Sequence, residues 1–75
     1  MAEEEVEPIV VTVDDQNLPI IQFVVTGLES AGMKVDRVLP VTGIITGAVS
    51  QSKLERLRKV PGVAHVEVDR EMEAI

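Results

Sequence analysis

The chain has 75 residues, of which 45% are hydrophobic and 27% charged, with a formal net charge of −6 and no cysteine. This length fits one small domain, which buries only about 60% of the surface that its unfolded chain exposes. Without cysteine, neither disulfides nor thiolate-bound metals are available to stabilise it. We therefore expect a marginally stable domain that gains stability from a binding partner.

Charge and hydropathy exclude two classes of partner. Uncharged stretches such as residues 16–28 are interrupted by polar residues, proline and glycine, and fall short of the roughly 20 apolar residues that span a bilayer. The excess of acidic residues disfavours nucleic acid, which binds basic surfaces. Residues 3–5 are glutamates where a signal peptide carries cations, so a cytoplasmic location is expected for the chain as written.

The first part of the chain predicts an arm, a strand and a helix. Residues 1–8 are acidic and without periodicity, which predicts a disordered arm. Residues 9–13 are all β-branched and predict a strand, because branched side chains fit a pleated surface. Asp15 or Asn17 is expected to cap the following helix, whose first turn suits Pro19.

The helix itself is indicated by apolar residues at three- and four-residue steps, which share one face. These residues are Leu18, Ile21, Val24, Val25 and Leu28. Gly32 is expected to end this helix in the left-handed conformation that glycine adopts at little cost.

Residues 33–39 alternate as a second strand, which Pro40 ends. Strict alternation would place Val35, Arg37 and Leu39 on one side of the strand, with the intervening residues on the other.

Residues 42–49 predict a third strand, in which Gly43 and Gly47 leave room for close approach by a neighbouring segment. Ser50 or Ser52 is expected to cap a shorter second helix. The apolar stripe of that helix is Leu54, Leu57 and Val60, and Pro61-Gly62 ends it.

Residues 63–69 alternate as a last strand, with Ala64, Val66 and Val68 on one side. The order strand, helix, strand therefore occurs twice. This predicts an α+β, ferredoxin-like βαββαβ fold over residues 9–70, an antiparallel four-stranded sheet with both helices on one face, and residues 71–75 as an extended tail. The uncovered sheet face would be rather apolar for a surface left to water. It would carry Val10, Thr12, Ile44, Thr46, Val63 and His65.

Enzymatic and cofactor-binding roles find little support in the composition. His65 is the single histidine, and neither a cysteine nucleophile nor a serine in a nucleophile-elbow motif accompanies it. The acidic runs lack calcium-loop spacing, and the turn after the first strand contains no glycine to cradle a phosphate. We expect no catalytic residues, no metal ligands and no cofactor.

Basic residues on the second helix predict a solvated face. Lys53, Arg56, Arg58 and Lys59 lie on its outer side, and cations in a last turn complement the helix dipole. RNA binding is disfavoured because the one aromatic residue, Phe23, belongs to the other helix and offers no stacking platform here.

The C-terminal part of the chain resembles the propeptides of subtilisin-like serine proteases and the free-standing inhibitors related to them. That family shows a basic helix, a Pro-x-Val turn and a strand of the form V-A-x-V-E-x-D, followed by about six residues. The matching residues here are Pro61, Val63, Ala64, Val66, Glu67 and Asp69. Upstream, residues 31–35 resemble the Gly-x-Lys-Val entry to the family's second strand, so the similarity covers roughly residues 30–75.

The resemblance implies a protease inhibitor that can also assist protease folding. The open sheet face would pack on two protease helices, and Glu67 and Asp69 would cap their N-termini, which attract anions. The tail would run extended into the active-site cleft and fill four subsites with Met72, Glu73, Ala74 and Ile75. An excised propeptide of this kind would be extracellular.

Two other functions share the predicted topology. One is a regulatory ligand-binding module of the ACT type, although such modules usually carry a glycine in the turn that residues 14–17 occupy here. The other is a homodimer in which two open sheet faces cover each other.

Overall fold

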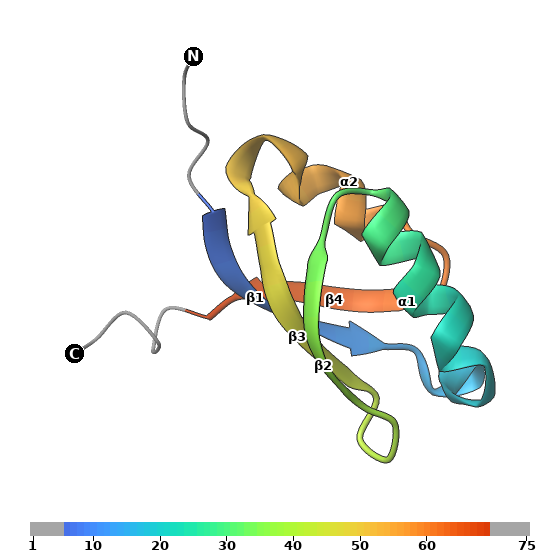
Figure 1. The fold of residues 1–75 in the computed structure, drawn as a ribbon. Helices are drawn as coiled ribbons and strands as arrows, with labels where there is room; N and C mark the ends of the chain where they lie inside the picture. The colour runs from blue at the N-terminus through green and yellow to red at the C-terminus, as the bar shows by residue number, and fades with distance from the viewer. Residues whose placement is uncertain (1–5, 70–75) are drawn as a thin grey trace.

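The computed structural model describes residues 6–69. Its sheet has four antiparallel strands in the order β2-β3-β1-β4, and both helices lie on the same side of it (Figure 1). This is the predicted α+β fold with ferredoxin-like topology. The strands are β1 (Val6–Val13), β2 (Lys34–Leu39), β3 (Ile44–Ser50) and β4 (Val63–Val68); the helices are α1 (Ile21–Ser30) and α2 (Leu54–Arg58), preceded by 3₁₀ turns at Asp15–Ile20 and Gln51–Lys53.

The core lies between the sheet and the two helices. Every second residue of β1 is buried from Ile9 to Val13, as strand geometry requires when one face is covered. The helices contribute Leu28 from α1 and Leu57 from α2, both fully buried. Within residues 6–69, no helix or strand covers the face of the sheet that points away from the helices, and we call this the open face.

β1 begins earlier than expected. Val6, Glu7 and Pro8 pair with the end of β3, so they belong to the strand and not to a disordered arm. Pro8 has no amide hydrogen to donate, but its carbonyl oxygen accepts a hydrogen bond of 2.8 Å from the amide of Asp69. The first and last strands are therefore joined up to the end of β4.

α1 ends where the sequence predicts and begins differently. Gly32 has a φ of +112°, and the amide of Met33 donates to the carbonyl oxygen of Leu28, a C-terminal cap of the Schellman kind. At the other end, a 3₁₀ turn precedes the helix and Ile20 occupies the N-cap position, without a side-chain hydrogen bond. The expectation that Asp15 or Asn17 caps α1 is wrong, because both residues lie inside that turn.

Both edge strands contain a bulge that changes which residues face the helices. In β2 the register shifts between Val35 and Arg37, so Asp36 is an extra residue without a partner. Val35 and Val38 consequently both pack against the core, while Arg37 pairs with Thr46 on the open face. Strict alternation through this strand was thus a wrong expectation.

The bulge in β4 moves Val63. The register shifts between Thr12 and Val13, so that Thr12 pairs with His65 but Val13 pairs with Val63, and Ala64 is the extra residue. Val63 packs against the core. It therefore does not belong to the open face on which the sequence analysis placed it.

Gly47 confirms the expected close approach of a neighbouring segment. A Cβ atom at this position would overlap the backbone carbonyl oxygen of Lys34 in β2.

At the end of β3, Ser50 takes the N-cap position of the 3₁₀ turn before α2, but its side chain makes no capping hydrogen bond.

Candidate functional site

The open face consists of three rows of residues that run across all four strands, from β2 through β3 and β1 to β4. The pairing registers define each row, and the backbone hydrogen bond between Asp69 and Pro8 completes the first. The first row is Lys34, Ala48, Pro8 and Asp69; the second is Arg37, Thr46, Val10 and Glu67; the third is Leu39, Ile44, Thr12 and His65.

The centre of the open face is formed by small and aliphatic side chains of β1 and β3. The structure brings together four residues that the sequence predicted there, with Val10 opposite Thr46 and Thr12 opposite Ile44. All four are half-buried, although no helix covers them. Such a surface can come close to a partner, because no long side chain stands at its middle.

The β4 edge of the face is acidic. Glu67 lies in β4 and Asp69 directly follows this strand, two residues later. They end adjacent rows, so both carboxylates lie on the open side, as the sequence predicted for a pair that meets one partner. Glu67 accepts a hydrogen bond of 3.0 Å at Oε2 when His65 Nε2 carries a proton. Both side chains of this contact are more than half exposed, so Glu67 remains accessible to a partner.

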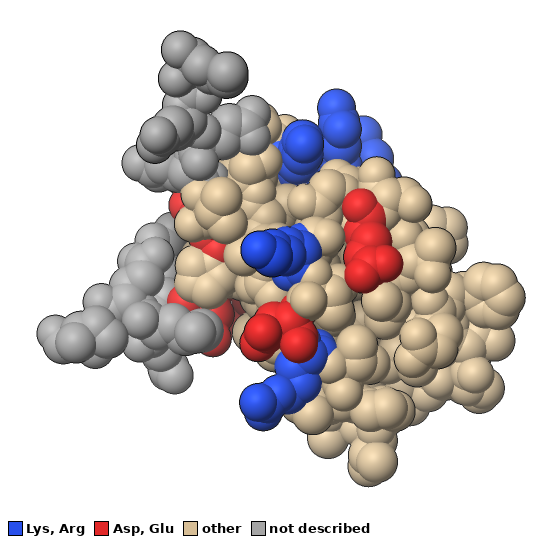
Figure 2. Space-filling model, viewed as in Figure 1, with Lys and Arg blue, Asp and Glu red and all other residues tan. Residues whose placement is uncertain are grey.

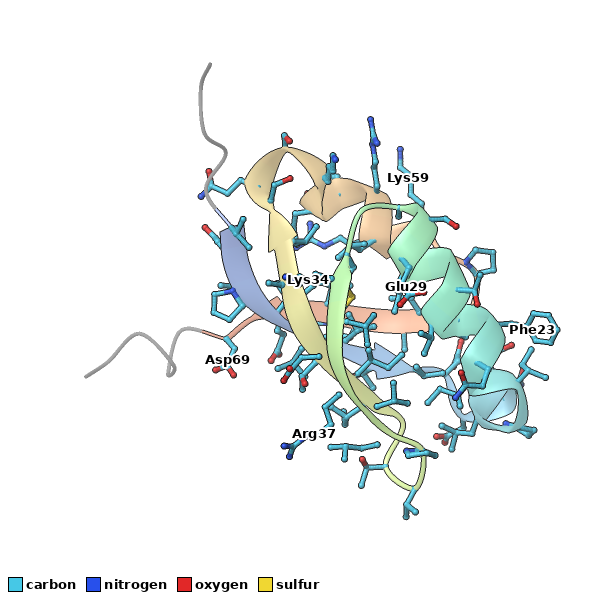
Figure 3. The ribbon with its side chains drawn as sticks, viewed as in Figure 1. Phe23, Glu29, Lys34, Arg37, Lys59 and Asp69 are labelled. Atoms are coloured by element: carbon cyan, nitrogen blue, oxygen red, sulfur yellow. The ribbon has the colours of Figure 1, made fainter. Side chains whose placement is uncertain are left out.

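The β2 edge of the face carries two cations, which the sequence did not predict there, and one acid, Asp36, at the bulge between them. Lys34 and Arg37 begin the first two rows and are exposed. Figure 3 shows the labelled Arg37 and Asp69 on the side of the sheet away from α1, whereas Phe23 projects from the opposite side of the molecule. The signal in the sequence was the spacing of Val35 and Val38, because valines three apart can share a face only across a bulge.

A groove of about 650 Å³ lies on the open face between these two edges. Its walls come from β2 and from the junction of β1 with Asp69, and its floor is formed by Thr46, Gly47 and Ala48 of β3. In Figure 2, basic side chains lie over β2 at the front of the molecule with an acidic side chain between them, and a second basic group lies over α2 at the top. The groove therefore has a floor of small residues, a β2 wall that carries Lys34, Asp36 and Arg37, and the carboxylate of Asp69 at its other end.

The basic residues of the second helical segment lie away from this groove. Arg58 forms an ion pair of 2.6 Å with Glu55 one turn earlier, and both side chains are at least half exposed. Exposed pairs of this kind contribute little to stability. The arrangement fits the solvated face that the sequence predicted.

Other chemistry is sparse within residues 6–69. That part of the chain contains no group of three or more histidine, aspartate or glutamate side chains placed to hold a metal ion. None of its helices is long and apolar enough to cross a membrane. The four residues expected in a protease cleft, Met72, Glu73, Ala74 and Ile75, lie outside the described residues.

Comparisons with protein-family models, curated proteins and solved structures gave no match.

Proposed function

We propose that this domain is an inhibitor of subtilisin-like serine proteases that works in the manner of their propeptides. The observation that carries the proposal is the placement of Glu67 and Asp69, side by side on the edge of an open and largely apolar sheet face. The propeptide resemblance requires this combination, since two protease helices would lie on the face while the two carboxylates meet the helix N-termini.

The physical chemistry of the face supports this use. Helix N-termini carry unpaired amide hydrogens and partial positive charge, so they attract carboxylates. Glu67 and Asp69 end neighbouring rows, and Val10 and Thr46 lie inward of Glu67 in the same row. A partner that presents two helices could bury the half-buried centre and pair both acids in a single approach.

The tail would complete inhibition. Residues 70–75 follow directly after Asp69, whose amide is fixed to Pro8 at the acidic edge. A segment that starts beside the docked face can reach the cleft of the same protease and pair with it as a strand. Met72, Glu73, Ala74 and Ile75 would then occupy the non-primed subsites and exclude substrate.

A regulatory module of the ACT type is less favoured. Its ligand would approach the backbone of the turn at residues 14–17, where two of the amides, those of Asp14 and Asn17, already have backbone partners. Val13 donates to Gly43, Asp14 to Gly62 and Asn17 to Asp14, each at 2.8 or 2.9 Å. These hydrogen bonds take up two amides that a ligand of the turn would otherwise use, and the turn lacks the glycine that allows close approach to its backbone.

Inhibition of peptide hydrolysis by a purified subtilisin tests the proposal. The chain should inhibit the protease, and changing Glu67 and Asp69 together to alanine should weaken inhibition. Each lost charge-assisted contact is worth roughly 1 to 2 kcal/mol, so the inhibition constant should rise by about 30-fold to 1000-fold.

The matched control removes two carboxylates from the helix layer instead. Glu29 in α1 and Glu55 in α2 are both exposed. Changing both to alanine removes two negative charges, as the test variant does, so the two double variants have the same net charge. It should inhibit like the unmodified chain. Equal inhibition by the two double variants would show that the acidic edge does not meet the protease.

A further inference from the structure

The charges on the open face are arranged so that a second copy of the chain is a complementary partner. The first row runs from Lys34 on β2 to Asp69 directly after β4, and the second runs from Arg37 to Glu67. Over these two rows the β2 edge thus carries two cations, with the exposed Asp36 at the bulge between them, and the β4 edge carries two carboxylates. The half-buried centre lies between the two edges.

We propose that two copies of this chain associate through their open faces around a two-fold axis parallel to the strands. Rotation about such an axis exchanges the two edges of the sheet and keeps each row at its own level. The β2 edge of one copy then lies over the acidic β4 edge of the other, so Lys34 faces Asp69 and Arg37 faces Glu67. Symmetry produces each of these pairs twice.

The other face-to-face arrangement is disfavoured by the same charges. A two-fold axis perpendicular to the strands would place β2 over β2 and β4 over β4 and would reverse the order of the rows. In the middle row, Arg37 would then meet Arg37 of the second copy and Glu67 would meet Glu67. Like charges in contact disfavour association. The charge pattern therefore selects one orientation, in which sheets pack about 10 Å apart and long charged side chains at the edges can meet.

The area of the face sets the strength of this dimer. Four strands about 4.8 Å apart and three rows about 7 Å apart give a face of roughly 400 Å². A standard interface buries about 800 Å² from each partner. We therefore expect a weak, reversible dimer whose population depends on concentration.

The dimer would hide the face that is proposed to meet a protease, so self-association and protease binding would compete. The inference itself does not depend on the proposed function, because it follows from the charges and the row order. The two can also fail separately, since oligomeric state is measured without any protease.

Sedimentation of the 75-residue chain over about a thousandfold range of concentration, reaching the millimolar range, tests the dimer. Arg37→Glu and Glu67→Arg should each weaken it by about tenfold or more, because each change creates two repulsive pairs. Combining them in one chain reverses both charges and should restore the dimer. High salt should weaken the dimer of the unmodified chain.

Matched controls distinguish the loss of these ion pairs from a change in the net charge of the chain. Glu29→Arg in α1 and Arg56→Glu in α2 make the same charge changes at exposed positions on the helices, and should leave the dimer unchanged. The proposal is overturned if the chain stays monomeric at the highest concentration, if the control variants act like the test variants, or if the combined variant is as weak as either single one.

Discussion

Replacing Gly47 by alanine should loosen β2 from the rest of the sheet. The new Cβ would overlap the carbonyl oxygen of Lys34 and would lie 2.9 Å from the terminal methyl carbon of Met33. The methionine side chain is flexible and can turn away. The carbonyl oxygen belongs to the backbone of β2, so its overlap is relieved only if the strand moves.

The expected loss of stability follows from two opposing terms. Overpacking a well-packed position costs typically about 1 to 3 kcal/mol, whereas replacing glycine by alanine returns roughly 0.4 to 1 kcal/mol through a less flexible unfolded chain. A net loss of about 1 to 2 kcal/mol should remain. In a domain of this size, each kcal/mol lowers Tm by roughly 4 to 8 °C, so we expect a decrease of about 5 to 15 °C.

Thermal unfolding followed by circular dichroism measures this loss, with Gly27→Ala as the control. At Gly27 the new Cβ would lie 2.8 Å from a methyl carbon of Val60, which would have to move, but no backbone atom is in the way and alanine favours a helix by about 1 kcal/mol. The Tm of Gly27→Ala should therefore fall clearly less than that of Gly47→Ala. Equal Tm values for the two variants would refute the close approach of β2 to Gly47.

Three further predictions concern the core and the acidic edge. Leu57→Ala should lower the free energy of unfolding in urea by about 2 to 5 kcal/mol, because Leu57 is fully buried and anchors α2. As a control, Phe23→Ala changes a side chain that is 75% exposed and should alter the free energy of unfolding by less than about 0.5 kcal/mol. Ser50→Ala should leave the free energy of unfolding unchanged or raise it by about 1 kcal/mol, because the buried Oγ of Ser50 has no hydrogen-bond partner within residues 6–69. A clear decrease in this free energy would contradict the prediction. Alanine at both Glu67 and Asp69 should leave Tm within about 3 °C of the unmodified chain, and a larger decrease would show that these acids stabilise the free domain.

The sequence was sufficient to predict the fold because its strongest signals are local. The β-branched run of residues 9–13, the apolar steps of the first helix and the turn at Gly32 each predict one element, and their order limits the topology. The centre of the open face followed from alternation in β1 and β3, where the pairing between Thr12 and Val10 on one side and Ile44 and Thr46 on the other is regular.

The two edge strands could not be predicted by alternation alone. Val35 and Val38 in β2 are three residues apart, as are Val63 and Val66 in β4, and all four pack on the core. A regular strand would turn one valine of each pair to water, so burial of both favours a bulge between them. The bulge at Asp36 in turn places Lys34 and Arg37 on the same face, which is why the two cations of the β2 edge were missed.

Cap positions at the helix starts were also missed. Asp15 and Asn17 have side chains suited to capping, but they lie in a 3₁₀ turn that precedes α1. Residue preference identifies the approach to a helix and does not separate a 3₁₀ turn from the α-helix that follows it.

The inhibition constant of the chain for a subtilisin, with and without its last four residues, tests the proposed function most directly. Deleting Met72 to Ile75 should abolish competitive inhibition, because the tail excludes substrate, while the Tm stays the same. Since a β-branched residue fits the primary pocket poorly, Ile75→Tyr should instead tighten inhibition by about 1 to 3 kcal/mol. If the full-length, shortened and Tyr-ended chains all leave a panel of subtilisins equally active, the domain is not a propeptide-like inhibitor.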